Sequence, residues 1–182
     1  MKITTVVVAV GRPGAGKTTS SDKTQAWNGV KTLPIHAEDY LKANHEHLVD
    51  AYNNHSLRDD AWILFWRHVK NVMCHYRGIP IVDMWLPTPK RRSEVVADLR
   101  RIGVEKIICW HFTTPPDICR ERYVRRESKK PEQDYHYGSH WNFLCHYSTG
   151  YKPVTCEEVA QQGASELDRL FLFDEIVEIS TE

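Results

Sequence analysis

The octet G-R-P-G-A-G-K-T at residues 11–18 constrains the fold of this chain more than any other feature. It matches the phosphate-binding pattern G-x-x-x-x-G-K-[ST] at every fixed position. The apolar, β-branched run 3–10 ahead of it has the composition of a strand buried on both faces. Residues 17–27 behind it can form a helix, so the octet has the strand–loop–helix context that the pattern requires. We therefore predict a nucleoside-triphosphate site.

Phosphate binding explains why the octet has this composition. Gly11, Gly14 and Gly16 are expected to allow φ > 0 and to direct backbone N–H groups at phosphate oxygens. Lys17 is expected to reach the β- and γ-phosphates, and the Thr18 hydroxyl to bind Mg²⁺. ATP and Mg²⁺ are thus the expected cofactors. The residues expected to bind the nucleotide are Gly11, Arg12, Pro13, Gly14, Ala15, Gly16, Lys17, Thr18 and Thr19.

Composition limits the domain organisation and the location. A length of 182 residues fits a single domain. The 24 basic and 24 acidic side chains balance, so no global basic field attracts nucleic acid and any polyanion site must be local. The five cysteines form no C-x-x-C pair, no run approaches the length of a membrane span, and the first strand leaves no room for a signal peptide. We expect a cytoplasmic protein without a membrane partner.

Strand and helix patterns alternate along the chain, which predicts an α/β fold of the P-loop NTPase type. The sheet is expected to be parallel and five-stranded, with helices on both faces. The predicted strands are 3–10, 32–36, 79–85, 106–112 and 175–179, and the predicted helices are 17–27, 57–76, 93–102, 115–126 and 157–170. Ligands of such sheets bind beyond the carboxyl ends of the strands, where the octet, Glu38, Asp39 and Asp83 all fall.

Several further motifs follow the octet in a particular order. They are I-H-A-E-D-Y at 35–40, V-D-M-W-L-P-T-P-K-R-R at 82–92, P-P-D-I-C-R-E-R-Y-V-R-R at 115–126, and Y-K-P-V-T-C-E-E at 151–158 before the last strand. This series resembles the polynucleotide kinase branch of P-loop kinases. That branch contains the phage polynucleotide 5′-kinase domain and is related to zeta-toxin-like kinases. The resemblance covers most of the chain, and no phosphatase half is present.

The resemblance implies roles for five residues outside the octet. Glu38, with Asp39 next to it, stands where the family has the acid that takes the proton of the attacking hydroxyl, and both residues remain candidates. Asp83 matches the residue that orients Mg²⁺ or its waters. Arg126 matches the lid arginine that stabilises charge on the transferred phosphoryl group, and Arg122 lies one helical turn earlier on the nucleotide side. The lid would span approximately residues 120–150.

Plainer interpretations stay open for these residues. Glu38 and Asp39 can be solvated loop acids or a helix N-cap, and Asp83 can be a turn residue. The basic residues from 122 to 130 can form an ordinary charged helix face. Arg91 and Arg92 either hold the acceptor or are simply exposed.

The sequence departs from the family, or from a metal-site pattern, at two places. The arginine that the family has three residues after the base is Leu41 here, with Lys42 beside it. A second group has metal-ligand residue types without a standard zinc spacing, which favours a lid that touches substrate over a zinc site. Its members are His136, His140, Cys145 and His146.

These features predict an ATP-dependent kinase that phosphorylates a hydroxyl of a nucleic acid or nucleotide. The acceptor can be a polynucleotide 5′-OH or a hydroxymethylated base such as 5-hydroxymethyluridine in phage DNA. Aromatic residues able to stack on bases, or to fill a core, are Trp62, Trp66, Tyr76, Trp85 and those of the segment 135–141. Alternatives are a small-metabolite or zeta-like nucleotide-sugar kinase, and a regulatory NTPase. The regulatory class is disfavoured, because no D-x-x-G follows the third strand and no N-K-x-D is present.

Overall fold

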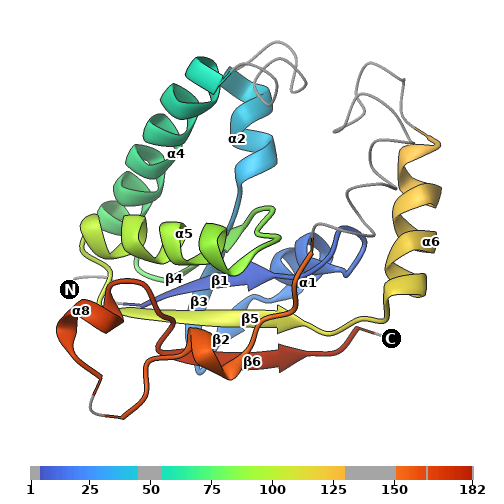
Figure 1. Ribbon diagram of the computed structural model, residues 1–182. Helices are drawn as coiled ribbons and strands as arrows, with labels where there is room; N and C mark the ends of the chain where they lie inside the picture. Colours follow the sequence, from blue (N-terminus) through green and yellow to red (C-terminus); the bar gives the residue numbers. More distant parts are fainter. Residues whose placement is uncertain (1–4, 45–54, 130–150, 163, 182) are drawn as a thin grey trace.

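A computed structural model of the chain describes residues 5–44, 55–129, 151–162 and 164–181. Its centre is a six-stranded sheet with the order β2-β3-β4-β1-β5-β6 (Figure 1). The strands are β1 (Thr5–Val10), β2 (Ala26–Trp27), β3 (Val30–His36), β4 (Ile79–Asp83), β5 (Lys106–Phe112) and β6 (Glu175–Ile179). All neighbouring strands pair in parallel except β2, which pairs antiparallel with β3. The α/β fold with a mostly parallel sheet is therefore confirmed.

The central strand β1 is buried throughout most of its length, because it has partners on both edges and cover on both faces. Residues 6–10 of β1 are fully buried. The strand pairs with β4 on one side and β5 on the other. Its β-branched composition suits this position, since no face of the strand meets water. In Figure 1 the arrows of β1, β5 and β6 all point toward the region of α1 and the start of α6.

Helices cover both faces of the sheet, as predicted. The helices are α1 (Lys17–Lys23), α2 (Ala37–Asn44), α4 (His55–His75), α5 (Pro89–Arg101), α6 (Pro116–Glu127) and α8 (Glu166–Arg169), with a 3-10 turn η2 (Cys156–Glu158). On one face, α4 and α5 contribute buried side chains such as Phe65 and Leu99 (Figure 1). On the other face, Cys119 and Tyr123 of α6 pack beside the loop before α1.

The expected first helix is too long, and this error accounts for the missing sixth strand. Helix α1 ends at Lys23, and Trp27 belongs to β2 instead. Asn28 and Gly29 have φ values of 49° and 75°, which turn the chain back so that Trp27 pairs with Val30. An Asn-Gly pair between apolar residues is a strong hairpin signal.

The expected helix over 157–170 is also wrong. Two short capped turns replace it, η2 and α8, and each begins with a reciprocal capping box, Thr155–Glu158 and Ser165–Asp168. Between the turns, Val159 pairs with the buried Phe173 in an isolated bridge. The extended backbone at this bridge is incompatible with a continuous helix.

Other boundaries differ less from the prediction. Helix α5 begins at Pro89 rather than residue 93, because the Thr88 side chain caps it by accepting a hydrogen bond from Arg91 N at 3.3 Å. Strands β5 and β6 have the predicted bounds. Over the described ranges, none of the helices combines the length and apolar character needed to span a membrane.

Candidate active site

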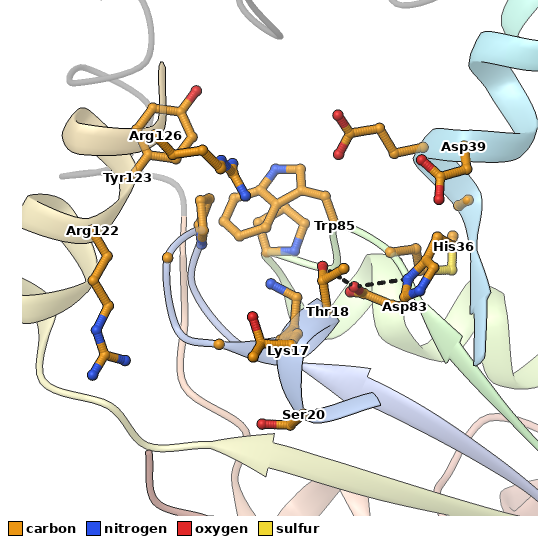
Figure 2. A pocket seen from close by; sticks show the side chains of 18 of the residues that line it. Lys17, Thr18, Ser20, His36, Asp39, Asp83, Trp85, Arg122, Tyr123 and Arg126 are labelled. Atoms are coloured by element: carbon orange, nitrogen blue, oxygen red, sulfur yellow. Dashed lines mark hydrogen bonds and ion pairs between the residues drawn. The ribbon is translucent and has the colours of Figure 1, made fainter. Parts of the chain in front are cut away.

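A cavity of about 900 Å³ lies at the carboxyl ends of the central strands (Figure 2). Most of the predicted site residues line it, although they come from four separate parts of the sequence. Those residues are Pro13, Gly14, Gly16, Lys17, Thr18, Thr19, Glu38, Asp39, Asp83, Arg122 and Arg126. Gly11, Arg12 and Ala15 belong to the same loop without lining the cavity. The structure therefore brings the predicted residues to one place.

The glycines give the phosphate-binding loop its shape in two different ways. Gly14 and Gly16 have φ values of 81° and 90°, as predicted, but Gly11 does not have positive φ. Gly11 is required for close approach, because a Cβ there would lie 2.7 Å from Cβ of Phe112. A Cβ at Gly14 would lie 2.1 Å from the carbonyl oxygen of Cys119. The loop is thus packed directly on the end of β5 and the start of α6.

Hydroxyl groups fix the loop from its far side. The carbonyl oxygen of Ala15 accepts hydrogen bonds from Thr114 Oγ1 at 3.0 Å and from Thr181 Oγ1 at 2.9 Å. The two hydroxyls also lie 2.7 Å apart. Thr181 follows β6, so the end of this strand holds the loop in place. Neither threonine is part of a recognisable motif, so sequence reasoning had no means of identifying them.

Lys17 lies at the floor of the cavity, where its Nζ donates hydrogen bonds to the carbonyl oxygens of Gly11 and Arg12, each at 3.1 Å. Burial lowers the pKa of Lys17; the charge of Arg126 acts in the same direction and that of Asp83 opposes it. The ammonium group is therefore held within the loop by carbonyl groups. It is positioned beside the space that the loop encloses.

Thr18 and Asp83 form the candidate metal-binding pair. Thr18 Oγ1 donates a hydrogen bond to Asp83 Oδ2 at 2.6 Å, joining α1 to the end of β4. Burial alone would raise the pKa of Asp83, but contacts with His36, Lys17 and Thr18 outweigh it and the pKa is lowered. A hydroxyl and an ionised carboxylate are hard oxygen donors of the type that Mg²⁺ prefers, so the pair fits this ion.

His36 joins this pair although the sequence analysis did not single it out. His36 Nδ1 lies 3.4 Å from Asp83 Oδ2, and Nε2 lies 2.8 Å from Asp22 Oδ1 (Figure 2). The contact with Asp83 raises the pKa of His36 to about 9 against the effect of burial, and Asp22 adds to the rise. His36 is the last residue of β3, two positions before Glu38, and this place at the carboxyl end of a strand is the signal that could have identified it.

Glu38 and Asp39 occupy the first turn of α2 and line the cavity. Glu38 is partly buried and Asp39 is exposed. Carboxylates in a first turn interact favourably with the helix dipole. This stabilising role at the start of a helix resembles the N-cap role that the sequence left open for these two acids. Figure 2 places Asp39 across the cavity from Arg126. Their place in the cavity is thus compatible with both interpretations, and either acid can face a substrate.

The two arginines of α6 point in different directions. Arg126 extends into the cavity toward Trp85, with its guanidinium carbon 5.2 Å from the centre of the Tyr123 ring (Figure 2). Arg122 also lines the cavity, but its side chain points toward the end of β6, where Nη1 donates a hydrogen bond to Thr181 Oγ1 at 3.1 Å. The two arginines are one helical turn apart on the same face of α6. This spacing places one guanidinium over the cavity and the other at the end of β6.

Of the four described aromatic residues expected either to stack on bases or to fill a core, two lie in the cavity wall: Trp62 and Trp85. Trp85 stacks on Tyr151, with ring centres 6.0 Å apart and an angle of 24° between the planes. By contrast, Trp66 packs in the core, and Tyr76 lies 5.5 Å from Lys31 Nζ outside the cavity lining. Trp66 therefore has the core role that was left open for it, and Tyr76 lies outside the cavity lining.

Arg91 and Arg92 have unlike roles. Arg91 lines the cavity, pairs with Glu94 at 2.9 Å and lies 5.3 Å from the centre of the Trp62 ring. Arg92 is fully buried, so neither role expected for it, acceptor binding or plain exposure, is correct. Its five N–H groups are all used, two on Glu158 and the others on carbonyl oxygens of Leu86, Lys152 and Pro153.

Several predictions fall on residues outside the described part of the chain. They concern the His/Cys group at 136–146, the aromatic segment 135–141 and most of the expected lid. The side chains of Leu41 and Lys42 are likewise not described.

The phosphate-binding loop, the mostly parallel sheet and the position of the cavity define a P-loop NTPase fold. Residues 6–139, well over half of the chain, match a family described as AAA domain, and the chain belongs to this family. No curated protein matches the sequence.

Three solved structures illustrate the likeness in fold. A candidate kinase from Chloroflexus aurantiacus j-10-fl has a TM-score of 0.63 at 13% identity, covering 97% of this chain and 88% of that one. A sugar kinase from Janibacter sp. HTCC2649 has a TM-score of 0.53 at 15% identity, covering 97% and 85%. A chain of the Pnkp1/Rnl/Hen1 RNA repair complex has a TM-score of 0.53 at 15% identity, covering 89% of this chain and 53% of that one.

Proposed function

We propose that the protein is an ATP-dependent kinase of the polynucleotide kinase branch, which transfers the γ-phosphate to a hydroxyl of a nucleic acid or nucleotide. One observation carries this proposal. A single cavity contains Lys17 and Thr18 of the phosphate-binding loop, the acids Glu38 and Asp39 on another wall, and the Arg126 guanidinium. Phosphoryl transfer to a hydroxyl needs these three elements around one space.

In this proposal, each residue of the cavity has a separate role in phosphoryl transfer. Backbone N–H groups of the loop and Lys17 hold the β- and γ-phosphates. Thr18 and Asp83 would bind Mg²⁺, which supplies positive charge to the phosphate oxygens. Glu38 or Asp39 takes the proton from the attacking hydroxyl. Arg126 stabilises the negative charge on the transferred group, since its planar fork matches phosphate oxygens.

The aromatic part of the cavity wall supports an acceptor that carries a base. Trp85 and Trp62 both line the cavity, and aromatic faces bind bases by stacking. The Arg91 guanidinium lies beside Trp62 and can contact a phosphate of the acceptor strand. This combination suits a 5′-terminal nucleotide or an extruded hydroxymethylated base.

A metabolite kinase is the second candidate, and the Arg91–Glu94 pair favours it. This pair offers both donors and acceptors within the cavity, which is what recognition of a polyhydroxylated acceptor requires. The likeness in fold to a sugar kinase is compatible with this alternative.

The test is transfer of label from γ-labelled ATP to a panel of acceptors. The panel contains 5′-OH oligonucleotides, DNA with hydroxymethylated bases, mononucleotides, sugars and nucleotide sugars. Labelling of an oligonucleotide or nucleotide acceptor supports the proposal, and labelling confined to sugars or nucleotide sugars supports the metabolite alternative. Phosphate release without any labelled acceptor would contradict a kinase and favour a regulatory NTPase.

Lys17→Ala is the matched control for this assay. Because Lys17 serves the β- and γ-phosphates, the variant is expected to lose transfer to every acceptor while it keeps the circular dichroism spectrum of the parent protein. Undiminished transfer in this variant would contradict the assignment of the loop.

A further inference from the structure

We propose that His36 is a positioning residue, which holds the Asp83 carboxylate against the Thr18 hydroxyl and thereby sets the affinity of the site for Mg²⁺ with nucleotide. The inference rests on the proposed use of Mg²⁺ and ATP, but it does not depend on which acceptor is phosphorylated. Its basis is a continuous chain of contacts, Asp22–His36–Asp83–Thr18 (Figure 2).

The topology places these four side chains together. His36 ends β3 and Asp83 ends β4, and the two residues are direct partners in the parallel register. Neighbouring residues in paired strands project to the same side of the sheet, so their side chains meet. Thr18 and Asp22 are four residues apart on α1 and therefore share one face of the helix. Each of these elements thus contributes to one cluster.

Burial explains why Asp83 needs a partner of this kind. The residue is only 8% exposed, and a buried carboxylate that lacks compensating contacts is strongly disfavoured. Thr18 and His36 both approach Oδ2, so together they fix the rotamer of the carboxylate. The lysine of the loop adds positive charge nearby, but its Nζ is bonded to carbonyl oxygens rather than to Asp83. The imidazole is therefore the group that orients the carboxylate from the side of β3.

Asp22 completes the arrangement from outside the cavity lining. Its contact at 2.8 Å involves the other ring nitrogen, so the imidazole cannot rotate without losing one of its two partners. Each ring nitrogen faces a carboxylate oxygen: Nε2 is hydrogen-bonded to Asp22, and Nδ1 makes the longer ion-pair contact with Asp83. Groups that orient metal ligands in this way typically change metal affinity 10- to 100-fold when they are removed.

Two isosteric variants separate the two contacts. In His36→Asn the amide nitrogen takes the place of Nδ1 and keeps an N–H group beside Asp83. In His36→Gln it takes the place of Nε2 and can donate only to Asp22. The probe is Mn²⁺ in the presence of ADP, measured by electron paramagnetic resonance without turnover. ADP binding without metal is measured in parallel, and His75→Asn, at an exposed histidine on α4, is the matched control.

We expect His36→Gln to weaken Mn²⁺ binding about 10-fold or more, and His36→Asn to stay within roughly threefold of the parent protein. Metal-free ADP binding should remain unchanged in both. The proposal is overturned if His36→Gln binds Mn²⁺ like the parent, if both variants weaken equally, or if metal-free ADP binding falls in parallel. The contrast is measured without an acceptor, so a failure to phosphorylate nucleic acid would leave it intact. Conversely, an active kinase without this contrast would remove His36 from the metal site.

Discussion

At the scale of single residues, the geometry leaves two acids in competition for one role. Glu38 and Asp39 are adjacent in the first turn of α2, and both line the cavity. We expect that either Glu38→Gln or Asp39→Asn lowers kcat by about 100-fold or more, because loss of a general base has this effect. The other amide variant and the affinity for ATP should change little. Steady-state kinetics with saturating acceptor measure this, and parental turnover in both variants would place the base elsewhere.

Arg126 allows a sharper residue-scale prediction. It extends over the cavity, so Arg126→Ala is expected to lower kcat about 1,000-fold with only a few-fold change in ATP affinity. Arg126→Lys should recover little of the loss, since an ammonium group lacks the planar fork. The control is Arg125→Ala, because Arg125 is exposed, pairs with Glu121 on the same helix and is absent from the cavity wall. Equal activity of Arg126→Ala and Arg125→Ala would exclude Arg126 from the reaction.

At the scale of secondary-structure elements, Arg92 ties α5 to the segment that carries Tyr151. The Arg92 side chain is fully buried, and its bidentate pair with Glu158 supplies two of its five hydrogen bonds. Arg92→Ala is expected to reduce the free energy of unfolding by about 3–5 kcal/mol, because it leaves a largely buried carboxylate unpaired. Arg101→Ala removes an exposed arginine of the same helix and should cost about 1 kcal/mol or less. Urea denaturation compares the two, and equal losses would contradict the anchoring role.

The elements also show where sequence reasoning succeeds and where it stops. Strand β1 was predictable because its sequence is an almost continuous β-branched run, and β5 and β6 because each is a short apolar segment containing isoleucine or valine. The octet alone identified the loop and Lys17. The hairpin at Asn28–Gly29 was predictable in principle, since its signal is local. The burial of Arg92 was not, because it depends on Glu158 and on carbonyl groups from about 60 residues further along the chain. His36 acquires its partners through strand register and through α1, and neither is encoded near it in the sequence.

At the scale of the whole molecule, the absence of net charge predicts how a nucleic-acid acceptor would bind. With 24 basic and 24 acidic side chains, only local cations such as Arg91 can contact strand phosphates. Each neutralised phosphate of a single strand contributes about −0.7 to the slope of log K against log salt. We expect a slope of about −1 to −2 for a 5′-OH oligonucleotide, and little gain in affinity beyond the first few nucleotides. Fluorescence anisotropy across a salt series measures this. A slope steeper than about −4 would require an extended basic surface.

The five hydrogen bonds of Arg92 also limit how this protein can vary during evolution. A lysine at position 92 would supply three donors without the planar fork, so it could not replace the arginine while Glu158 remains. A neutral side chain at either position would leave the charge at the other position buried without its ion-pair partner. Descendants that lose one partner must therefore lose the other, and the segment from Tyr151 to Glu158 would need a new attachment at the same time. In lineages of this protein, positions 92 and 158 should change together or stay fixed, although they are 66 residues apart in the sequence.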